Sequence, residues 1–181
     1  EYYDTGEKKF EGYYKNNEKD GKWIKWDKSG NKISDTFYKK GKKDGQYTEY
    51  WNLNQKPSSG GIYRNDKKDG KWVQWYDKDK KIKKEETLFR NGKENGEYKE
   101  WYESGYDKTQ GNYKNGLRDG IWFEWYLKEY DERLNDMKKG WENTGYIEGK
   151  KRLETKYIDG EKIGDSVEHD EGDQTFYEPD Y

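Results

Sequence analysis

A short motif recurs five times along this chain, and it constrains the fold more than any other feature. Each copy has Asp or Asn, then Gly, any residue, an aromatic residue, two further residues and a second aromatic residue, as in DGKWVQW at 69–75. The motif glycines lie 24 to 26 residues apart. They are Gly21, Gly45, Gly70, Gly96 and Gly120. Self-similarity at such a period is typical of repeat proteins, in which each unit packs on its neighbours.

A second landmark, a single aromatic residue, stands seven residues before each motif glycine. These residues are Tyr14, Tyr38, Tyr63, Phe89 and Tyr113. Polar turn sequences separate the two landmarks, for example KNNEKDG at 15–21 and KNGLRDG at 114–120. Asn, Asp and Gly tolerate the positive φ angles that tight hairpin turns require. Each unit is therefore predicted to be a β-hairpin of about 24 residues, with the motif glycine in its turn.

The composition selects between a disordered chain and a folded β protein. Charged residues make up 42% of the chain and hydrophobic ones only 28%, a balance that is typical of disorder. However, Trp, Tyr and Phe account for 18%, and alanine is absent. Abundant aromatic residues favour strands, and the lack of alanine disfavours a helical array. We therefore predict a folded, all-β protein.

The repeated units resemble a known family. YKNGLRDGIWFEWY at 113–126 and its siblings are similar to the MORN repeat, in the variant form common in bacterial proteins. The resemblance covers residues 1 to about 164. It implies an elongated, single-layer antiparallel sheet in which hairpins stack end to end.

The predicted array covers 1–164, with Gly140 and Gly164 as further repeat glycines. Residues 127–139 depart from the pattern, because both the turn glycine and the leading Tyr are lost there. Two interpretations stay open: a shortened repeat, or a short amphipathic helix. The helix would place Leu127, Tyr130, Leu134 and Met137 on one face.

The C-terminal segment 165–181 differs in charge from the rest. It holds seven acidic residues and no Lys or Arg, which leaves 37 basic against 32 acidic residues in 1–164, a net charge of +5. We predict that this tail either caps the last hairpin, through Val167, Phe176 and Tyr177, or stays mobile as an electrostatic handle for a basic partner.

The motif rings have two interpretations. Alternate strand residues face opposite ways, so Trp72 and Gln74 share one face while Val73 and Trp75 share the other. Most rings are expected to pack on the ring of the next hairpin, because a thin sheet has no second layer. Rings left exposed would form a binding platform. The candidate partner-binding residues are Trp23, Trp26, Tyr47, Trp51, Trp72, Trp75, Tyr98, Trp101, Trp122 and Trp125.

Residues for catalysis or metal binding are scarce. His169 is the only histidine, and cysteine is absent. The acidic run DSVEHDEGD at 165–173 lacks the spacing of a calcium-binding loop. Phosphate-binding and nucleophile-elbow motifs do not occur. We therefore predict no catalytic residues, no metal and no cofactor, and a protein that is not an enzyme.

The predicted function is a non-catalytic repeat scaffold that binds a protein partner. Bacterial MORN-variant proteins include antitoxin or immunity proteins, so the resemblance implies toxin neutralisation as one version. The alternatives are a carbohydrate or cell-envelope binding module, or attachment to anionic membranes through the turn lysines. Nucleic acid is disfavoured, because acidic residues interleave with the basic ones, and open sheet ends would permit self-association.

The compartment stays open at this point. EYYDTG at 1–6 matches EWYESG at 100–105, so the chain opens inside a repeat, and either its N-terminus is trimmed or its ordered part begins within a unit. Two locations are therefore compatible with the sequence: the cytoplasm, or export after removal of a leader.

Overall fold

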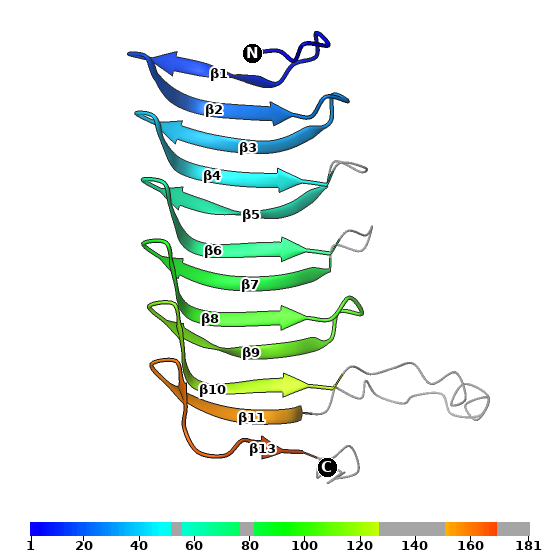
Figure 1. The fold of residues 1–181 in the computed structure, drawn as a ribbon, viewed down its shortest axis with the longest axis vertical. Helices are drawn as coiled ribbons and strands as arrows, with labels where there is room; N and C mark the ends of the chain where they lie inside the picture. Colours follow the sequence, from blue (N-terminus) through cyan, green and yellow to red (C-terminus); the bar gives the residue numbers. More distant parts are fainter. Residues whose placement is uncertain (52–55, 77–81, 127–150, 170–181) are drawn as a thin grey trace, which may run out of the picture.

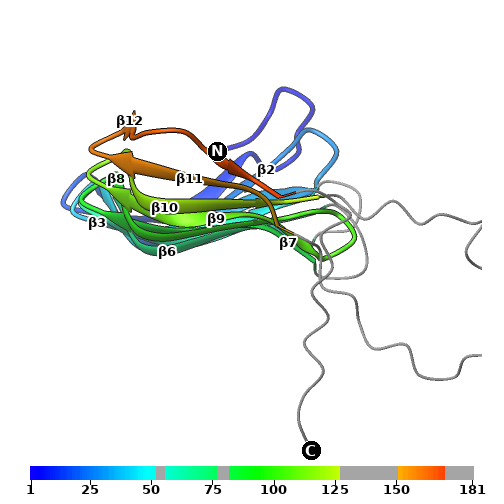
Figure 2. The ribbon, with the colours of Figure 1, turned by 90° about the horizontal axis from the view of Figure 1, so that it is seen from below.

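The computed structural model describes residues 1–51, 56–76, 82–126 and 151–169, and these form one antiparallel sheet of 13 strands. Strands β1 to β12 follow one another in sequence order, and β13 pairs with β11. Figure 1 shows the strands stacked along the long axis, and Figure 2, along that axis, shows one curved layer. The predicted all-β, single-layer sheet of consecutive hairpins is confirmed.

The strands have the following bounds. The first six are β1 Phe10–Lys15, β2 Glu18–Trp26, β3 Lys32–Lys39, β4 Lys42–Tyr50, β5 Pro57–Arg64 and β6 Lys67–Trp75. They are followed by β7 Lys83–Arg90, β8 Lys93–Trp101, β9 Asp107–Lys114, β10 Leu117–Trp125, β11 Lys151–Ile158, β12 Glu161–Lys162 and β13 Val167–Glu168.

Two-residue turns join the strands on the side where the landmark aromatics lie. In the turn between β9 and β10, Asn115 has φ 54° and Gly116 has φ 90°. Asn16 and Asn17, at 52° and 62°, do the same between β1 and β2. Two consecutive positive φ angles match the right-handed twist of the flanking strands, which explains the Asn-rich turns of the sequence.

The motif glycines do not lie in these turns, so their predicted placement is wrong. All five have positive φ, as expected, with values from 69° at Gly70 to 127° at Gly45. Each of them, however, lies inside the longer strand of its hairpin, at a β-bulge. From Tyr13↔Asp20 to Glu11↔Ile24, for example, β2 advances four residues while β1 advances two. Glycine is required because the extra residues of the bulge force a left-handed conformation.

Within the described residues, the buried hydrophobic side chains are three tryptophans on one face of the sheet, which we call the core face. Trp23, Trp72 and Trp122 keep only 8%, 7% and 2% of their surface accessible. The indole of Trp72 lies against Gly61, where an added Cβ would stand 2.4 Å from the ring. Its indole N–H donates to the Ile62 carbonyl at 3.1 Å. Trp23 and Trp122 repeat this arrangement on Gly12 and Gly111.

The other two hairpins carry tyrosine at the same position, so the packing repeats every two hairpins. Tyr47 lies between the tryptophans, and its ring stacks on that of Trp72 at 5.7 Å. Its neighbour on the preceding strand is Thr36 instead of a glycine. Tyr98 and Thr87 repeat this combination. A large indole is therefore paired with a glycine beneath it, and a smaller phenol with a threonine.

Cations cover the buried rings from the solvent side. The Nζ of Lys68 lies 4.3 Å from the ring centroid of Trp72, and the guanidinium of Arg118 lies 4.1 Å from that of Trp122. Lys19 lies 4.4 Å from the centroid of Trp23. Cation–π attraction and aliphatic stems thus replace the second layer that this sheet does not have in its described part.

The last long strand, β11, is covered on its outer side by short pieces of the chain. β12 pairs with its end at Tyr157 and Ile158, and β13 pairs with Leu153 and Glu154. Val167 of the predicted tail is thus opposite Glu154. Phe176 and Tyr177 lie outside the described residues. The predictions for 127–139 and for Gly140 also lie outside the described residues.

Candidate functional site

A groove of about 770 Å³ opens on the core face over the middle of the sheet. Its size lies within the range of small-ligand and peptide pockets. It is lined by Ile33, Tyr47, Glu49, Tyr50, Trp51, Ser58, Ser59, Tyr63, Lys68, Trp72, Gln74, Trp75, Lys84, Glu85 and Phe89. All of these residues lie in strands β3 to β7 except Trp51, which directly follows β4, so one continuous hydrogen-bonded sheet forms the floor.

One side of the groove is a row of packed rings. The ring centroid of Trp72 lies 5.0 Å from that of Tyr63 and 6.3 Å from that of Phe89. Burial, followed by the nearby charge of Glu49, raises the pKa of Tyr47 to about 12. The Tyr47 hydroxyl therefore keeps its proton at neutral pH, and it can donate a hydrogen bond.

Beside the rings runs a row of polar side chains, one from each of four neighbouring strands. The strand register places Glu49 opposite Ser59, Ser59 opposite Gln74, and Gln74 opposite Glu85. We call these four residues the polar row. Strands lie about 4.8 Å apart, so the two carboxylates stand roughly 14 Å from each other.

Hydrogen bonds orient the two carboxylates of the polar row. The Ser59 hydroxyl donates to Glu49 Oε2 at 3.0 Å, and the Thr87 hydroxyl donates to Glu85 Oε1 at 2.7 Å. Gln74 between them is exposed. The groove thus combines aromatic rings with oriented acceptors, a combination that binds cationic side chains or sugar rings.

The ten predicted binding residues fall into four groups, and Trp72 belongs to two of them. Trp23, Trp72 and Trp122 are buried, so the structure assigns them to packing and leaves hardly any ring surface for a partner. Tyr47, Trp51, Trp72 and Trp75 line the groove. Tyr98 lies on the core face beyond the groove, with its ring 5.3 Å from that of Trp122.

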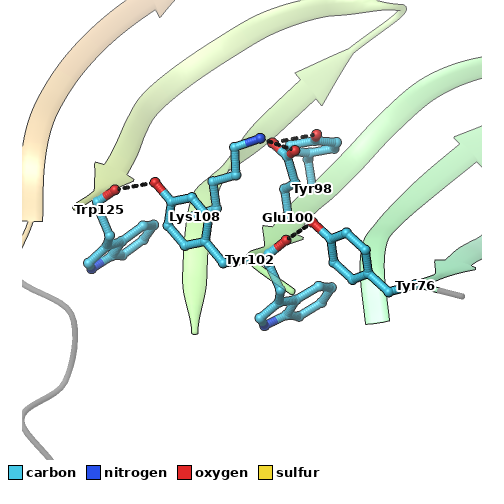
Figure 3. Close-up of polar contacts among 7 residues, drawn as sticks. Tyr76, Tyr98, Glu100, Tyr102, Lys108 and Trp125 are labelled. Carbon is cyan, nitrogen blue, oxygen red and sulfur yellow. Dashed lines mark hydrogen bonds and ion pairs between the residues drawn. The ribbon is translucent and has the colours of Figure 1, made fainter. Parts of the chain in front are cut away.

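The remaining three, Trp26, Trp101 and Trp125, are half-buried at the ends of their strands. Their backbone carbonyls accept hydrogen bonds from tyrosine hydroxyls two strands away. Tyr76 donates to Trp101 at 2.8 Å and Tyr102 donates to Trp125 at 2.9 Å. Figure 3 shows the Trp125 ring directed away from Tyr98, Glu100 and Lys108. These hydrogen bonds tie successive hairpins together and hold the strand ends in place.

The opposite side of the sheet, which we call the reverse face, carries acid groups held by lysines. Lys22 Nζ lies 3.0 Å from Asp35 Oδ2. Tyr50, which also borders the groove because it is the last residue of β4, donates its hydroxyl to the same oxygen at 2.9 Å. Burial alone would raise the pKa of Asp35, but these hydrogen bonds and the charges of Lys22 and Lys32 leave it below its ordinary value.

Glu86 repeats this arrangement two hairpins further along the sheet. Lys71 and Lys83 pair with its carboxylate, Lys83 at 2.6 Å. Here too, burial opposes ionisation, and the two lysines lower the pKa of Glu86 overall. Both acid groups are therefore charged at neutral pH, and lysines of the chain pair with both carboxylates, which indicates a structural role.

Reasoning from the sequence missed the polar row, because it considered only rings and glycines. Glu49 and Gln74 each stand four residues after a motif glycine, as do Glu100 and Glu124. A polar residue at that fixed offset was the available signal. Its partners Ser59 and Glu85 belong to returning strands, and only the register of the sheet places them in the same row.

Comparison with known proteins adds no family and no relative. A scan against models of protein families finds no match, and a search of curated proteins finds none either. In residues 1–51, 56–76, 82–126 and 151–169, no helix has the length and apolar character to cross a membrane. Within the same ranges, no group of three or more His, Cys, Asp or Glu residues could hold a metal ion.

Proposed function

We propose that this chain is a non-catalytic scaffold that binds a protein partner in the groove of its core face. The observation that carries the proposal is that consecutive strands of one hydrogen-bonded sheet build the groove. Its rings and acceptors are therefore held in place before a partner arrives, which lowers the entropic cost of binding. The long sheet extends the contact area on both sides of the groove.

Toxin neutralisation is the specific version of this proposal. It is supported by the resemblance to bacterial MORN-variant proteins, which include antitoxin or immunity proteins. A repeat scaffold can block a toxin by covering its active surface, and it needs no chemistry of its own to do so. Carbohydrate binding is the second candidate, because the groove places aromatic rings beside acceptor groups that could bind sugar hydroxyls.

Site-specific photo-crosslinking tests the binding face. A photoreactive residue at Gln74 would lie in the groove, whereas one at Ile62, which is 41% exposed, would lie on the reverse face of the same sheet region. We expect a specific protein crosslink from position 74 and not from position 62. The captured protein, once purified, should bind the chain in calorimetry.

Two results would contradict the proposal. One is a crosslink that forms only from position 62, or from neither position in cells of the source organism. The other is saturable binding of soluble glycans with a change in tryptophan fluorescence, which would favour carbohydrate. Binding to anionic vesicles that falls steeply with salt would instead favour the membrane alternative.

A further inference from the structure

Comparison of the five hairpins with each other exposes one position where the second hairpin differs. On the core face, the residue four positions after each motif glycine has a neighbour on the returning strand. A β-bulge leaves this neighbour without a paired residue in the strand register. Between Glu100↔Thr109 and Trp101↔Asp107, for example, Lys108 is skipped. The five pairs are Lys25 with Ile33, Glu49 with Ser58, Gln74 with Lys84, Glu100 with Lys108, and Glu124 with Arg152.

In the last two pairs, the bulged residue is a cation that neutralises the acid. Lys108 Nζ lies 2.6 Å from Glu100 Oε1, and Arg152 pairs with Glu124. The hydrogen bond to Glu100 is the main reason that the pKa of Lys108 is raised. Lys108 also lies over the Tyr102 ring, 5.9 Å from its centroid, and Figure 3 shows it reaching the Glu100 carboxylate.

In the second pair the cation is missing, because Ser58 occupies the position of Lys108. Glu49 accepts a hydrogen bond from Ser59, and within the described residues it has no ion pair. Trp51 stands where Tyr102 stands in the fourth hairpin, six residues after the motif glycine. Glu49, Ser58 and Trp51 all line the groove.

Neither of the two lysines that line the groove, Lys68 and Lys84, forms an ion pair with Glu49 within the described residues. Lys68 lies over Trp72 and, at 4.8 Å, over Phe89. Lys84 is the bulged residue of the third pair, three strands from Glu49, which corresponds to roughly 14 Å. The fold therefore provides a carboxylate that no cation of the described residues neutralises, and an aromatic residue at the end of the same strand.

We propose that Glu49 receives a Lys or Arg side chain of the bound protein, at the place where Lys108 lies in the fourth hairpin. This inference rests on the proposed function and specifies which partner residue the groove recognises. The partner's cation would pair with the Glu49 carboxylate and lie over the indole of Trp51. This placement follows the fourth hairpin, where Lys108 pairs with Glu100 and lies over Tyr102, and Trp binds cations better than Tyr does.

The test uses a blocked tripeptide, acetyl-Gly-Arg-Gly-amide, titrated into the full chain and followed by NMR of the tryptophan indole N–H signals. We expect a saturable shift of the Trp51 signal. Glu49→Gln should raise the dissociation constant of the tripeptide at least about tenfold. Ser58→Lys should do the same, because the new lysine supplies the missing cation from within the chain. Thermal unfolding of each variant checks that the sheet stays folded.

Glu124→Gln is the matched control, because it removes the same charge from a carboxylate that Arg152 already holds. It should leave tripeptide binding unchanged. The inference would be overturned if Glu124→Gln weakened tripeptide binding as much as Glu49→Gln does. It would also be overturned if saturable binding were unchanged in both Glu49→Gln and Ser58→Lys. The lack of any saturable shift would overturn it as well.

The crosslink from position 74 separates this inference from the proposed function. If the crosslink persists in Ser58→Lys while the tripeptide does not bind the unmodified chain, the scaffold function stands and the cation site is wrong. If no crosslink forms in the unmodified chain, the scaffold function itself fails.

Discussion

The two faces of this single-layer sheet are stabilised in different ways. On the core face, indole rings lie flat on glycines and lose nearly all contact with water, as Trp122 does with 2% exposure. On the reverse face, Phe37, Ile62 and Ile121 remain 38%, 41% and 44% exposed, and lysine–carboxylate clusters stand between them. A sheet without a second layer buries apolar surface only where a side chain can lie on its own backbone. Its stability should therefore be concentrated on the core face.

The largest expected effect is the loss of a buried indole. Trp122→Ala should lower the free energy of unfolding by roughly 3–5 kcal/mol, because it removes a large buried ring and leaves a cavity. Trp125→Ala is the comparison: its ring is half-buried, and the hydrogen bond from Tyr102 goes to its backbone carbonyl, which alanine keeps. Urea denaturation measures both. Equal losses would show that a buried indole of the core face contributes no more stability than a half-buried indole at a strand end.

A smaller effect is expected from filling the space beneath an indole. Gly61→Ala places a Cβ 2.4 Å from the Trp72 ring, which should cost about 1–3 kcal/mol through overpacking. Adding Trp72→Tyr should recover part of this loss, because a smaller ring leaves room for the methyl group. Double-mutant analysis of unfolding midpoints gives the coupling. Strict additivity of the two changes would refute the pairing of indole with glycine.

The smallest effect concerns the acid groups of the reverse face. The folded pKa of Asp35 lies below its unfolded value of about 3.9, so the native state holds this proton more weakly than the unfolded chain does. The stability this group contributes is therefore complete above roughly pH 5 and is lost as the pH falls through the folded pKa. Urea denaturation at a series of pH values should show that the free energy of unfolding falls less between neutral and acid pH in Asp35→Asn than in the unmodified chain. An unchanged slope would mean that Asp35 adds nothing.

Much of the fold follows from the spacing of a few residue types. The period of the motif glycines predicted the hairpins, and the aromatic-rich, alanine-free composition predicted strands. Positive φ at Gly70 was also predictable, because Asp-Gly and Asn-Gly repeat at each motif. The position of Gly70 in a β-bulge could not be predicted, because the local sequence does not show how many residues the facing strand supplies.

The sequence by itself determined the hairpin, its period and the need for left-handed glycines, because these depend on neighbours along the chain. The tertiary structure alone decided that the packing repeats every two hairpins, with Trp72 on Gly61 and Tyr47 beside Thr36. It also decided that Glu49 lies beside Ser58 in a groove, while Glu100 lies beside Lys108. The physical reason is register: hydrogen bonds between strands, with a bulge in each, select which distant side chains meet.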